Sequence, residues 1–315
     1  MKYEELFSDF NRGKKTALAR MITLVDNEEP EGIEFLKENY SKRKDSFRLG
    51  ITGPPGVGKS SLLNHLIDYF AKKYEKVGVI AIDPSSPFTG GALLGDRLRM
   101  NRAYENENVF IRSVASRGSL GGLSTSTENI SQVMEGFGMD IILIETVGVG
   151  QSELDIMEIT DAVVVVLVPE SGDSIQAMKA GLMEIGDIFV VNKSDREGSD
   201  RAVEFIKSSL SFKKKENERE IPVIKTSASN EYNIDILAMQ IEETQKLLIE
   251  SGALKQKREN RKEKEVKDIL RDMFIKSIDK HLKNMENINE SPYEKANKIL
   301  QKTGINFTED LWKKR

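Results

Sequence analysis

Residues 51–61 read Ile-Thr-Gly-Pro-Pro-Gly-Val-Gly-Lys-Ser-Ser and fit the phosphate-binding pattern G-x-x-x-x-G-K-[ST]. The strand-like run Arg48–Thr52 leads into the pattern, and apolar residues at helical spacing follow it. In this context the backbone N–H groups of the loop and the helix N-terminus can hold a β-phosphate. We therefore predict a nucleoside triphosphate site formed by Gly53, Pro54, Pro55, Gly56, Val57, Gly58, Lys59, Ser60 and Ser61.

A second motif predicts which base the site reads. Residues 192–195 read Asn-Lys-Ser-Asp directly after an apolar run. The Asp195 carboxylate can accept hydrogen bonds from N1–H and the 2-amino group of guanine, whereas adenine would leave it unpaired. Ser227 and Ala228 resemble a further guanine motif of GTPases, in which a backbone N–H meets O6. The predicted ligand is GTP or GDP, and the predicted base-site residues are Asn192, Lys193, Asp195, Ser227 and Ala228.

Carboxylates that end apolar runs predict a Mg²⁺ site. Asp83 and Glu145 each end such a run, and Asp96 is a third candidate. Mg²⁺ keeps several waters and uses few protein carboxylates, so these groups would bind it directly or through water. A strand-end charge or a helix cap is the alternative for each. The predicted metal residues are Ser60, Asp83, Asp96 and Glu145, while Lys59 would reach the β- and γ-phosphates.

The motif after Glu145 predicts slow hydrolysis. Gly148 could present its N–H to the γ-phosphate. In Ras-like GTPases the glutamine that orients the attacking water follows this glycine directly. Val149 stands there in this chain, and Gln151 comes three residues after the glycine. We therefore expect rearrangement or a partner to supply the missing group.

Two further segments are predicted to move. Pro169–Lys179 follows an apolar run, although the start of a solvated helix is an equal alternative. The stretch Ser116–Thr127 is rich in glycine and serine. The predicted catalytic residues are Lys59, Glu145, Gln176 and Lys179.

Short apolar runs alternate with longer amphipathic stretches from residue 47 onward. Several runs are continuously apolar, as expected for strands covered on both faces. The pattern predicts an α/β fold, with a doubly wound, mostly parallel sheet around the P-loop. The predicted strands are Arg48–Thr52, Val77–Ile82, Val109–Val114, Ile141–Ile144, Ala162–Val168, Ile188–Val191 and Val223–Thr226.

Helical extensions are predicted at both ends of the chain. Residues 1–46 form the first, 47–250 the GTPase domain and 251–315 a helical dimerisation region. In the last region an apolar stripe packs either on its own chain or against a second subunit. The apolar positions of the first extension are Leu6, Phe10, Ala17, Met21, Leu24 and Val25, and then Ile33, Leu36 and Tyr40 after Pro30.

Composition excludes several classes of protein. The 315 residues carry a net charge of −4, which argues against a whole-chain surface for nucleic acid. No cysteine is present, so disulfides, thiolate metal sites and thiol catalysis are excluded. His65 and His281 are the two histidines, and we expect His65 to pack rather than to take part in chemistry. The longest aliphatic run is far too short for a membrane span, and the N-terminus lacks a signal sequence. We expect a cytoplasmic protein without nucleic-acid or membrane partners.

The motifs GPPGVGKSS, IDPSS, GDRLRM, RGSLGGLS, ETVGVGQSE and NKSD closely resemble the methylmalonyl-CoA mutase-associated GTPases. That family belongs with the metallochaperone GTPases of the SIMIBI class. The resemblance implies a homodimeric GTPase that gates cofactor loading of an adenosylcobalamin-dependent acyl-CoA mutase and protects or reactivates it. By the same resemblance Asp83, Asp96 and Glu145 fall at Mg²⁺ positions, and Asp173–Lys179 falls in the family's third switch.

Two other functions remain open from the sequence. Nickel delivery is performed by related metallochaperone GTPases, but this chain offers few soft or imidazole ligands. A protein kinase of amino-acid transport proteins is an older label for such sequences. A kinase usually uses ATP, and the guanine motif argues against it.

Overall fold

The computed structural model describes residues 3–84, 106–116, 122–146, 152–169, 181–211, 220–283 and 291–302. The chain forms two compact units, Met1–Arg258 and Glu259–Arg315. No helix in these described ranges is long and apolar enough to cross a membrane. The division at residues 46 and 250 that the sequence suggests stays a prediction.

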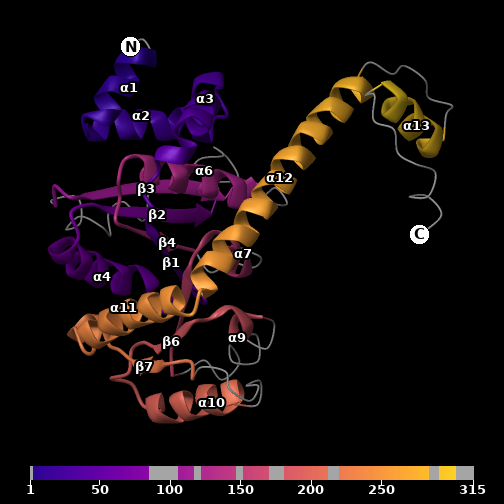
Figure 1. Ribbon diagram of the computed structural model, residues 1–315. Helices are drawn as coiled ribbons and strands as arrows, with labels where there is room; N and C mark the ends of the chain where they lie inside the picture. The colour runs from indigo at the N-terminus through magenta and orange to yellow at the C-terminus, as the bar shows by residue number, and fades with distance from the viewer. Residues whose placement is uncertain are drawn as a thin grey trace. The chain divides into compact units, whose positions relative to one another are not determined.

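A seven-stranded sheet lies at the centre of the first unit (Figure 1). Its strand order is β3-β2-β4-β1-β5-β6-β7, and every pairing is parallel. The predicted P-loop α/β fold is confirmed, and each predicted strand is present to within two residues at either end. The strands are β1 (Phe47–Thr52), β2 (Val77–Pro84), β3 (Val109–Ser116), β4 (Ile141–Glu145), β5 (Ala162–Leu167), β6 (Ile188–Val191) and β7 (Val223–Lys225).

Helices cover both faces of this sheet, which explains why its strands are apolar on both sides. Alternate side chains of β1, such as Leu49 and Ile51, pack with α4 (Lys59–Lys73) and α11 (Ile234–Glu250). Seven further described helices lie on the opposite side of the sheet, some of them directly on the strands and the N-terminal ones through α6. These are α1 (Tyr3–Asn11), α2 (Lys15–Asp26), α3 (Pro30–Asn39), α6 (Gly122–Gly136), α7 (Ser152–Ile159), α9 (Leu182–Ile185) and α10 (Ser199–Ser211).

The N-terminal extension consists of three helices that pack on α6. Phe10 lies edge-on to Phe35 and to Phe137, with ring centroids 4.9 and 5.2 Å apart. The predicted apolar positions of α1 and α2 are buried. The helix predicted after Pro30 is present as α3. Tyr40 lies just beyond its end, in the 3-10 turn Tyr40–Lys42, and is 44% exposed. Phe35 is the large apolar residue of α3 that is fully buried.

The structure describes only part of the glycine- and serine-rich stretch Ser116–Thr127, and its mobility stays a prediction. Residues 122–127 form the first turns of α6. Ser126 Oγ donates to Asp26 Oδ1 at 2.7 Å, and this bond ties the helix to the end of α2. Tertiary packing here outweighs the weak helix propensity of glycine and serine. Residues 117–121 lie outside the described residues.

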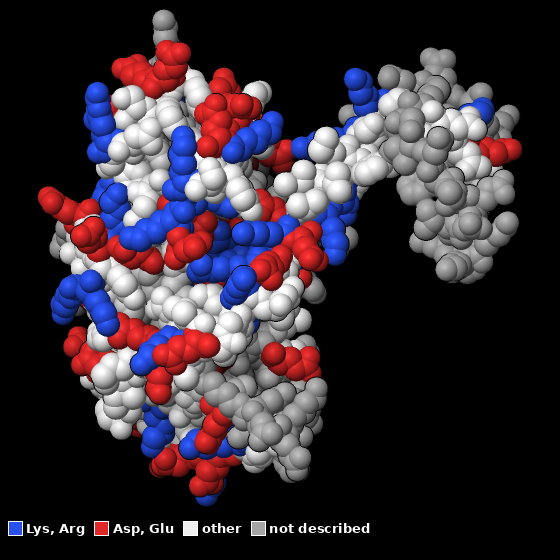
Figure 2. Space-filling model, in the orientation of Figure 1, with Lys and Arg blue, Asp and Glu red and all other residues white. Residues whose placement is uncertain are grey.

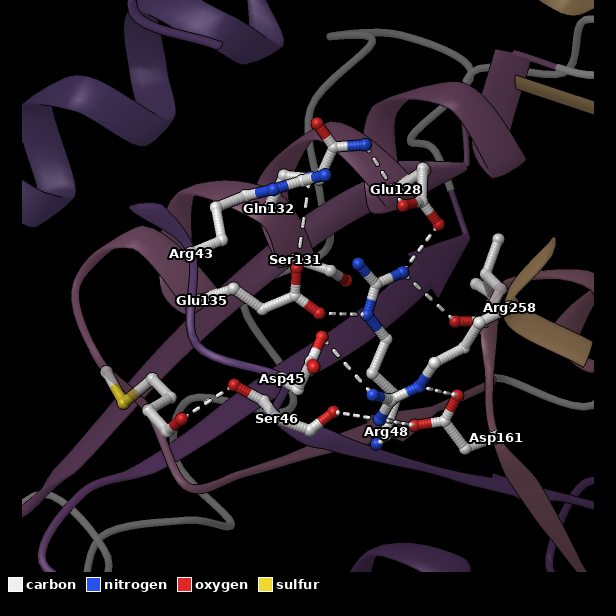
Figure 3. Close-up of polar contacts among 12 residues, drawn as sticks. Arg43, Asp45, Ser46, Arg48, Glu128, Ser131, Gln132, Glu135, Asp161 and Arg258 are labelled. Carbon is white, nitrogen blue, oxygen red and sulfur yellow. Dashed lines mark hydrogen bonds and ion pairs between the residues drawn. The ribbon is translucent and has the colours of Figure 1, made fainter. Parts of the chain in front are cut away.

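A buried ionic network lies at the amino ends of the strands, at the edge of the sheet opposite the P-loop (Figure 3). Arg48 of β1 is 2% exposed and donates to Glu135 on α6 at 2.7 Å and to Glu128 on α6 at 2.5 Å. Burial alone would lower the pKa of the Arg48 guanidinium, but the two carboxylates outweigh burial and raise this pKa well above its ordinary value. Arg48 is therefore charged in the core, and it joins β1 to α6.

Basic residues in the first turns of α12 (Ala253–Lys283) also bind to this network. Arg258 Nη2 donates to Asp161 Oδ2 at 2.9 Å and to the Ser46 carbonyl at 2.9 Å. Asp161 is fully buried just before β5, and it also accepts from the backbone N–H of Arg48 at 3.0 Å. Lys257 binds Asp187, just before β6, at 3.2 Å. Lys257 and Arg258 of α12 thus bind the residues that directly precede β6 and β5, two neighbouring strands of the sheet.

The second unit contains the rest of α12 and α13 (Pro292–Lys302). Several large apolar side chains of α12 are exposed, and Met273 reaches 64%. The others are Val266, Ile269, Leu270, Phe274, Ile275 and Leu282. Whether this apolar stripe packs on its own chain or against a second subunit stays a prediction.

Candidate functional site

The loop at residues 53–58 joins the carboxyl end of β1 to the first turn of α4. Two of its glycines are required by close approach as well as by positive φ angles. A Cβ on Gly53, whose φ is +138°, would lie 2.1 Å from the Val166 carbonyl oxygen. A Cβ on Gly58, whose φ is +91°, would lie 2.5 Å from Nδ2 of Asn192. The loop can therefore approach β5 and the residues after β6 only because both positions lack side chains.

Lys59, the first residue of α4, folds back over the loop. Its Nζ donates to the carbonyl oxygens of Gly53 at 2.7 Å and Pro54 at 2.9 Å, and the residue is 6% exposed. The ammonium group thus lies against the loop, close to the N-terminus of α4. Both features favour an anion in this position.

Ser60 and Glu145 meet beside the loop. Ser60 Oγ donates to Glu145 Oε1 at 2.7 Å, and Glu145 is 5% exposed at the end of β4. Next to them the hydroxyl groups of Thr52 and Thr146 lie 2.9 Å apart, both fully buried or nearly so. The oxygen donors of Ser60 and Glu145 are of the kind that Mg²⁺ prefers. Among the described residues no group of three or more His, Asp or Glu could hold a metal ion by itself.

A cavity of about 670 Å³ opens over these groups. Its wall includes two glycines of the loop, together with other residues of both sides of the site: Gly56, Gly58, Lys59, Ser60, Glu145, Thr146 and Lys193. The volume lies within the usual range of about 300–1,000 Å³ for pockets that bind small molecules. It lies beyond the carboxyl ends of the strands, where the strand order reverses around β1, the usual ligand site of an open α/β sheet.

Asn192 connects the three loops of the site. Its Nδ2 donates to the Val57 carbonyl of the P-loop at 2.8 Å. Its Oδ1 accepts from Thr226 Oγ1 and from the Ala228 N–H, both at 3.1 Å. The side chain is 1% exposed, so these bonds are sheltered from water. One amide therefore links the phosphate loop to the segment Thr226–Ala228 that follows β7, called here the base loop.

Asp195 lies on the loop that follows β6, beside the base loop. Ser227 Oγ donates to Asp195 Oδ1 at 2.5 Å, and this bond holds the pKa of the Asp195 carboxyl below its ordinary value. Lys193 adopts a positive φ of 55°, and its Nζ donates to the Gly56 carbonyl at 2.7 Å. The ionised carboxylate is exposed, so it can accept hydrogen bonds from a ligand.

The predicted site residues are thus brought together wherever the structure describes them. The predicted residues Gly148, Asp96, Gln176 and Lys179 lie outside the described residues. Asp83 is described in its backbone alone, as part of β2. The roles of all these residues stay predictions.

Sequence reasoning missed three residues of the site. The sequence did offer a signal for two of them. Thr146 directly follows Glu145, and Thr226 directly precedes Ser227. His65 was expected only to pack, but its Nε2 lies 2.8 Å from the Ala228 carbonyl oxygen. A contact between residues this far apart in the chain leaves no local pattern in the sequence.

A parallel sheet that carries a G-x-x-x-x-G-K-S loop beside an Asn-Lys-x-Asp loop defines the class of P-loop GTPases. Residues 18–283 match the model of the family described as Methylmalonyl Co-A mutase-associated GTPase MeaB. The chain belongs to this family, and it is a GTPase.

Similar proteins agree with this assignment. A putative GTPase of Pyrococcus horikoshii is 44% identical over 309 residues, which cover 95% of this chain and 98% of that protein. The mitochondrial methylmalonic aciduria type A homolog of Caenorhabditis elegans is 35% identical over 300 residues, 89% of this chain and 75% of that protein. The crystal structure of a LAO/AO transport system kinase is similar with a TM-score of 0.71 and 25% identity, and covers 96% of this chain and 97% of its own.

Proposed function

We propose that this GTPase gates the loading of cofactor into an adenosylcobalamin-dependent acyl-CoA mutase and protects or reactivates that mutase. The observation that carries the proposal is the family match over residues 18–283, because the family is described by its association with methylmalonyl-CoA mutase. The name of the relative from C. elegans points to the same metabolic context. The organisation of the site supports a guanine nucleotide as the switch.

The binding roles follow from the contacts within the site. Lys59 binds the β- and γ-phosphates. Its hydrogen bonds to the Gly53 and Pro54 carbonyl oxygens already place the ammonium group beside the phosphate loop. Asp195 accepts from guanine N1–H and the 2-amino group, with Ser227 holding the carboxylate in its ionised form. A backbone N–H of the segment that contains Ser227 and Ala228 would donate to O6. Gly148 donates its N–H to the γ-phosphate.

Mg²⁺ fits the residues present, because Ser60 and Glu145 bring two oxygen donors together at the cavity wall. Ser60, Glu145, Asp83 and Asp96 would hold the ion. Bound Mg²⁺ would neutralise charge on the phosphate oxygens during transfer. Glu145 meanwhile orients the Ser60 hydroxyl from the end of β4.

Hydrolysis by the protein alone is slow in this proposal, because Val149 stands where a water-orienting glutamine is found in Ras-like GTPases. Gln176 and Lys179 complete the site when the mutase docks. A charged or amide group supplied in this way acts on the transition state, and an arginine that does so raises the rate by about 10³–10⁵.

The GTPase acts as a homodimer, and the exposed apolar residues of α12 support this. Protein surfaces rarely leave an apolar stripe of this kind open to water unless another molecule covers it. A second copy of α12 is the simplest cover. The cytoplasmic location, and the absence of nucleic-acid and membrane partners, stay predictions. In Figure 2 basic and acidic side chains lie beside one another over the face shown.

A kinase of amino-acid transport proteins is the second candidate, because the similar crystal structure carries that name. The Asp195–Ser227 pair argues against it, since it is arranged for guanine and kinases usually use ATP. Metal delivery is a third, weaker candidate, because two histidines and no cysteine offer few soft ligands.

The experiment is phosphate release from GTP with and without a cognate adenosylcobalamin-dependent mutase, with association followed by size-exclusion chromatography. We expect slow turnover alone, acceleration by the mutase and a stable complex. Lys59→Ala is the inactive control. Gln176→Ala and Lys179→Ala should keep the slow rate but lose most of the acceleration. If the mutase neither binds nor changes the rate, the proposed partnership is wrong. Label from γ-phosphate that appears on protein would favour the kinase.

A further inference from the structure

Two buried threonine hydroxyl groups join the strand that leads into the phosphate loop to the strand that carries Glu145. Thr52 is the last residue of β1 and directly precedes Gly53 of the loop, while Thr146 directly follows Glu145 at the end of β4. Their Oγ1 atoms lie 2.9 Å apart. Thr52 is fully buried and Thr146 is 1% exposed, so the hydrogen bond between them is sheltered from water.

The backbone of the two strands explains why these side chains meet. β1 and β4 are parallel neighbours, and Ile51 lies opposite Glu145 in their register. The next pair along the strands is Thr52 and Thr146, whose side chains project from the same face of the sheet. The Thr146 N–H also donates to the Ile51 carbonyl at 3.1 Å. Thr146 is therefore bound to the end of β1 twice, once through its backbone and once through its hydroxyl group.

Thr146 lies between two groups that the proposed function uses. Directly before it, Glu145 accepts from Ser60 Oγ at 2.7 Å. Two residues after it comes Gly148, the proposed donor to the γ-phosphate. Thr146 itself forms part of the cavity wall beside Ser60 and Glu145. The bond to Thr52 thus holds the chain at the point where it leaves the sheet toward the proposed γ-phosphate donor.

From this geometry we propose that Thr52 and Thr146 form a positioning pair for the γ-phosphate, which holds the end of β4 against the start of the phosphate loop. The proposal rests on the proposed roles of the phosphate loop and of Gly148. A diphosphate has no γ-phosphate, so its binding by the loop does not depend on the pair. The pair therefore contributes to the affinity for GTP but not to the affinity for GDP.

The first test compares GDP with the non-hydrolysable GTP analogue GppNHp, both with Mg²⁺, on purified full-length variants. Thr146→Val keeps the shape of the side chain and removes its hydroxyl group. It should weaken binding of GppNHp about two- to tenfold, the effect of one lost hydrogen bond, and leave GDP affinity close to that of the wild type. Thr146→Ser retains a hydroxyl group and should keep most of the affinity for GppNHp.

Thr160→Val is the matched control for the loss of a buried threonine hydroxyl group. Thr160 is 3% exposed, and its Oγ1 donates to the Ile156 carbonyl at 2.7 Å, one turn earlier along α7. It comes just before β5, at the amino ends of the strands, whereas the phosphate loop follows a carboxyl end. This variant should lower the melting temperature without changing the ratio of the two affinities. Thermal melting also establishes that each variant is folded.

The second test asks whether the two hydroxyl groups act as one unit. Thr52→Val removes the other half of the same bond, so adding Thr146→Val to it should cause no further loss of GppNHp affinity or of GTP turnover. Losses that multiply in the double variant would show that the hydroxyl groups act independently and would overturn the proposal. Equal weakening of GDP and GppNHp by Thr146→Val would overturn it as well, because that result indicates general loosening of the site.

Failure of the proposed phosphate site has a different signature. If Lys59→Ala hydrolyses GTP at the wild-type rate, the phosphate site is wrongly assigned and the role of the pair falls with it. If Lys59→Ala is inactive and Thr146→Val keeps the full affinity for GppNHp, the role of the pair fails alone. These measurements use the GTPase without a mutase, so they do not depend on the proposed partner.

Discussion

At the scale of single residues, the site depends on side chains that bind backbone groups of other loops. Asn192 reaches the Val57 carbonyl and the Ala228 N–H, and its Nδ2 lies where a Cβ on Gly58 would have to be. The position of the Asn192 side chain therefore requires a glycine at residue 58. A substitution at either position would move the phosphate loop and the base loop together rather than one of them.

Asp195→Asn should change which base the protein binds. The amide offers a donor to the 2-oxo group of xanthine but repels the donors of guanine. We expect GDP affinity to fall at least about tenfold, since hydrogen bonds to a charged group are lost, and xanthosine diphosphate to bind better than GDP. Competition binding measures both ligands. A variant that still prefers GDP would contradict the role of Asp195.

Ser227→Ala should shift the pH dependence of GDP binding. Ser227 lowers the pKa of Asp195, so the ionised, binding form persists as pH falls below the ordinary aspartate range near about 3.9. A lowered pKa in the folded state also contributes stability that is present at neutral pH and lost as pH falls through that pKa. Without the serine the pKa returns toward its ordinary value, and GDP affinity should decline at a higher pH.

The measurement for this prediction is GDP affinity from neutral pH down to about pH 4, close to the ordinary aspartate pKa. Ser229→Ala is the control, because Ser229 contacts Ser227 at 3.2 Å, whereas Ser227 itself binds Asp195. Identical pH profiles for the wild type and Ser227→Ala would show that another group sets the state of the carboxylate.

At the scale of elements, the sequence was informative where the pattern is local. Apolar runs such as Ala162–Val168 are long enough, and bounded clearly enough, to predict all seven strands. The P-loop was predictable because its residues are contiguous. The contacts of Asn192 and His65 were not, because they join segments far apart in the chain. The sequence predicted the helix α3, but spacing alone does not decide whether Phe35 or its neighbour Leu36 is the more deeply buried.

Arg48→Ala should destabilise the junction between β1 and α6. It removes the guanidinium that binds Glu128 and Glu135 and leaves two carboxylates buried. Removing one partner of a buried ion pair lowers the free energy of unfolding by about 3–5 kcal/mol. Denaturant unfolding measures the loss, with GDP present and absent.

Arg43→Ala is the matched control for Arg48→Ala. Arg43 approaches the same Glu135 at 3.8 Å, but its side chain is more exposed. We expect a smaller loss of stability for this variant. Similar losses for the two arginines would show that the burial of Arg48 is not what makes it important.

At the scale of the whole molecule, the exposed apolar side chains of α12 predict self-association. Ile269→Glu with Met273→Glu places two charges among these residues and should convert a dimer to a monomer. Light scattering over a range of concentrations measures the mass. Met239→Glu is the control, because Met239 is 53% exposed on α11, outside the stripe. A wild type that is monomeric at every concentration would contradict the proposed homodimer.

The bond between Arg258 and Asp161 has a consequence for synthesis on the ribosome. Translation adds about 5–20 residues per second, and residue 258 belongs to the last fifth of the 315-residue chain. Until it emerges, Asp161 lacks the guanidinium that binds it in the finished sheet, and a buried carboxylate without that partner is costly. The sheet therefore gains this ion pair only after residue 258 has been made. A truncated chain that ends before Arg258 would remain in the same incomplete state.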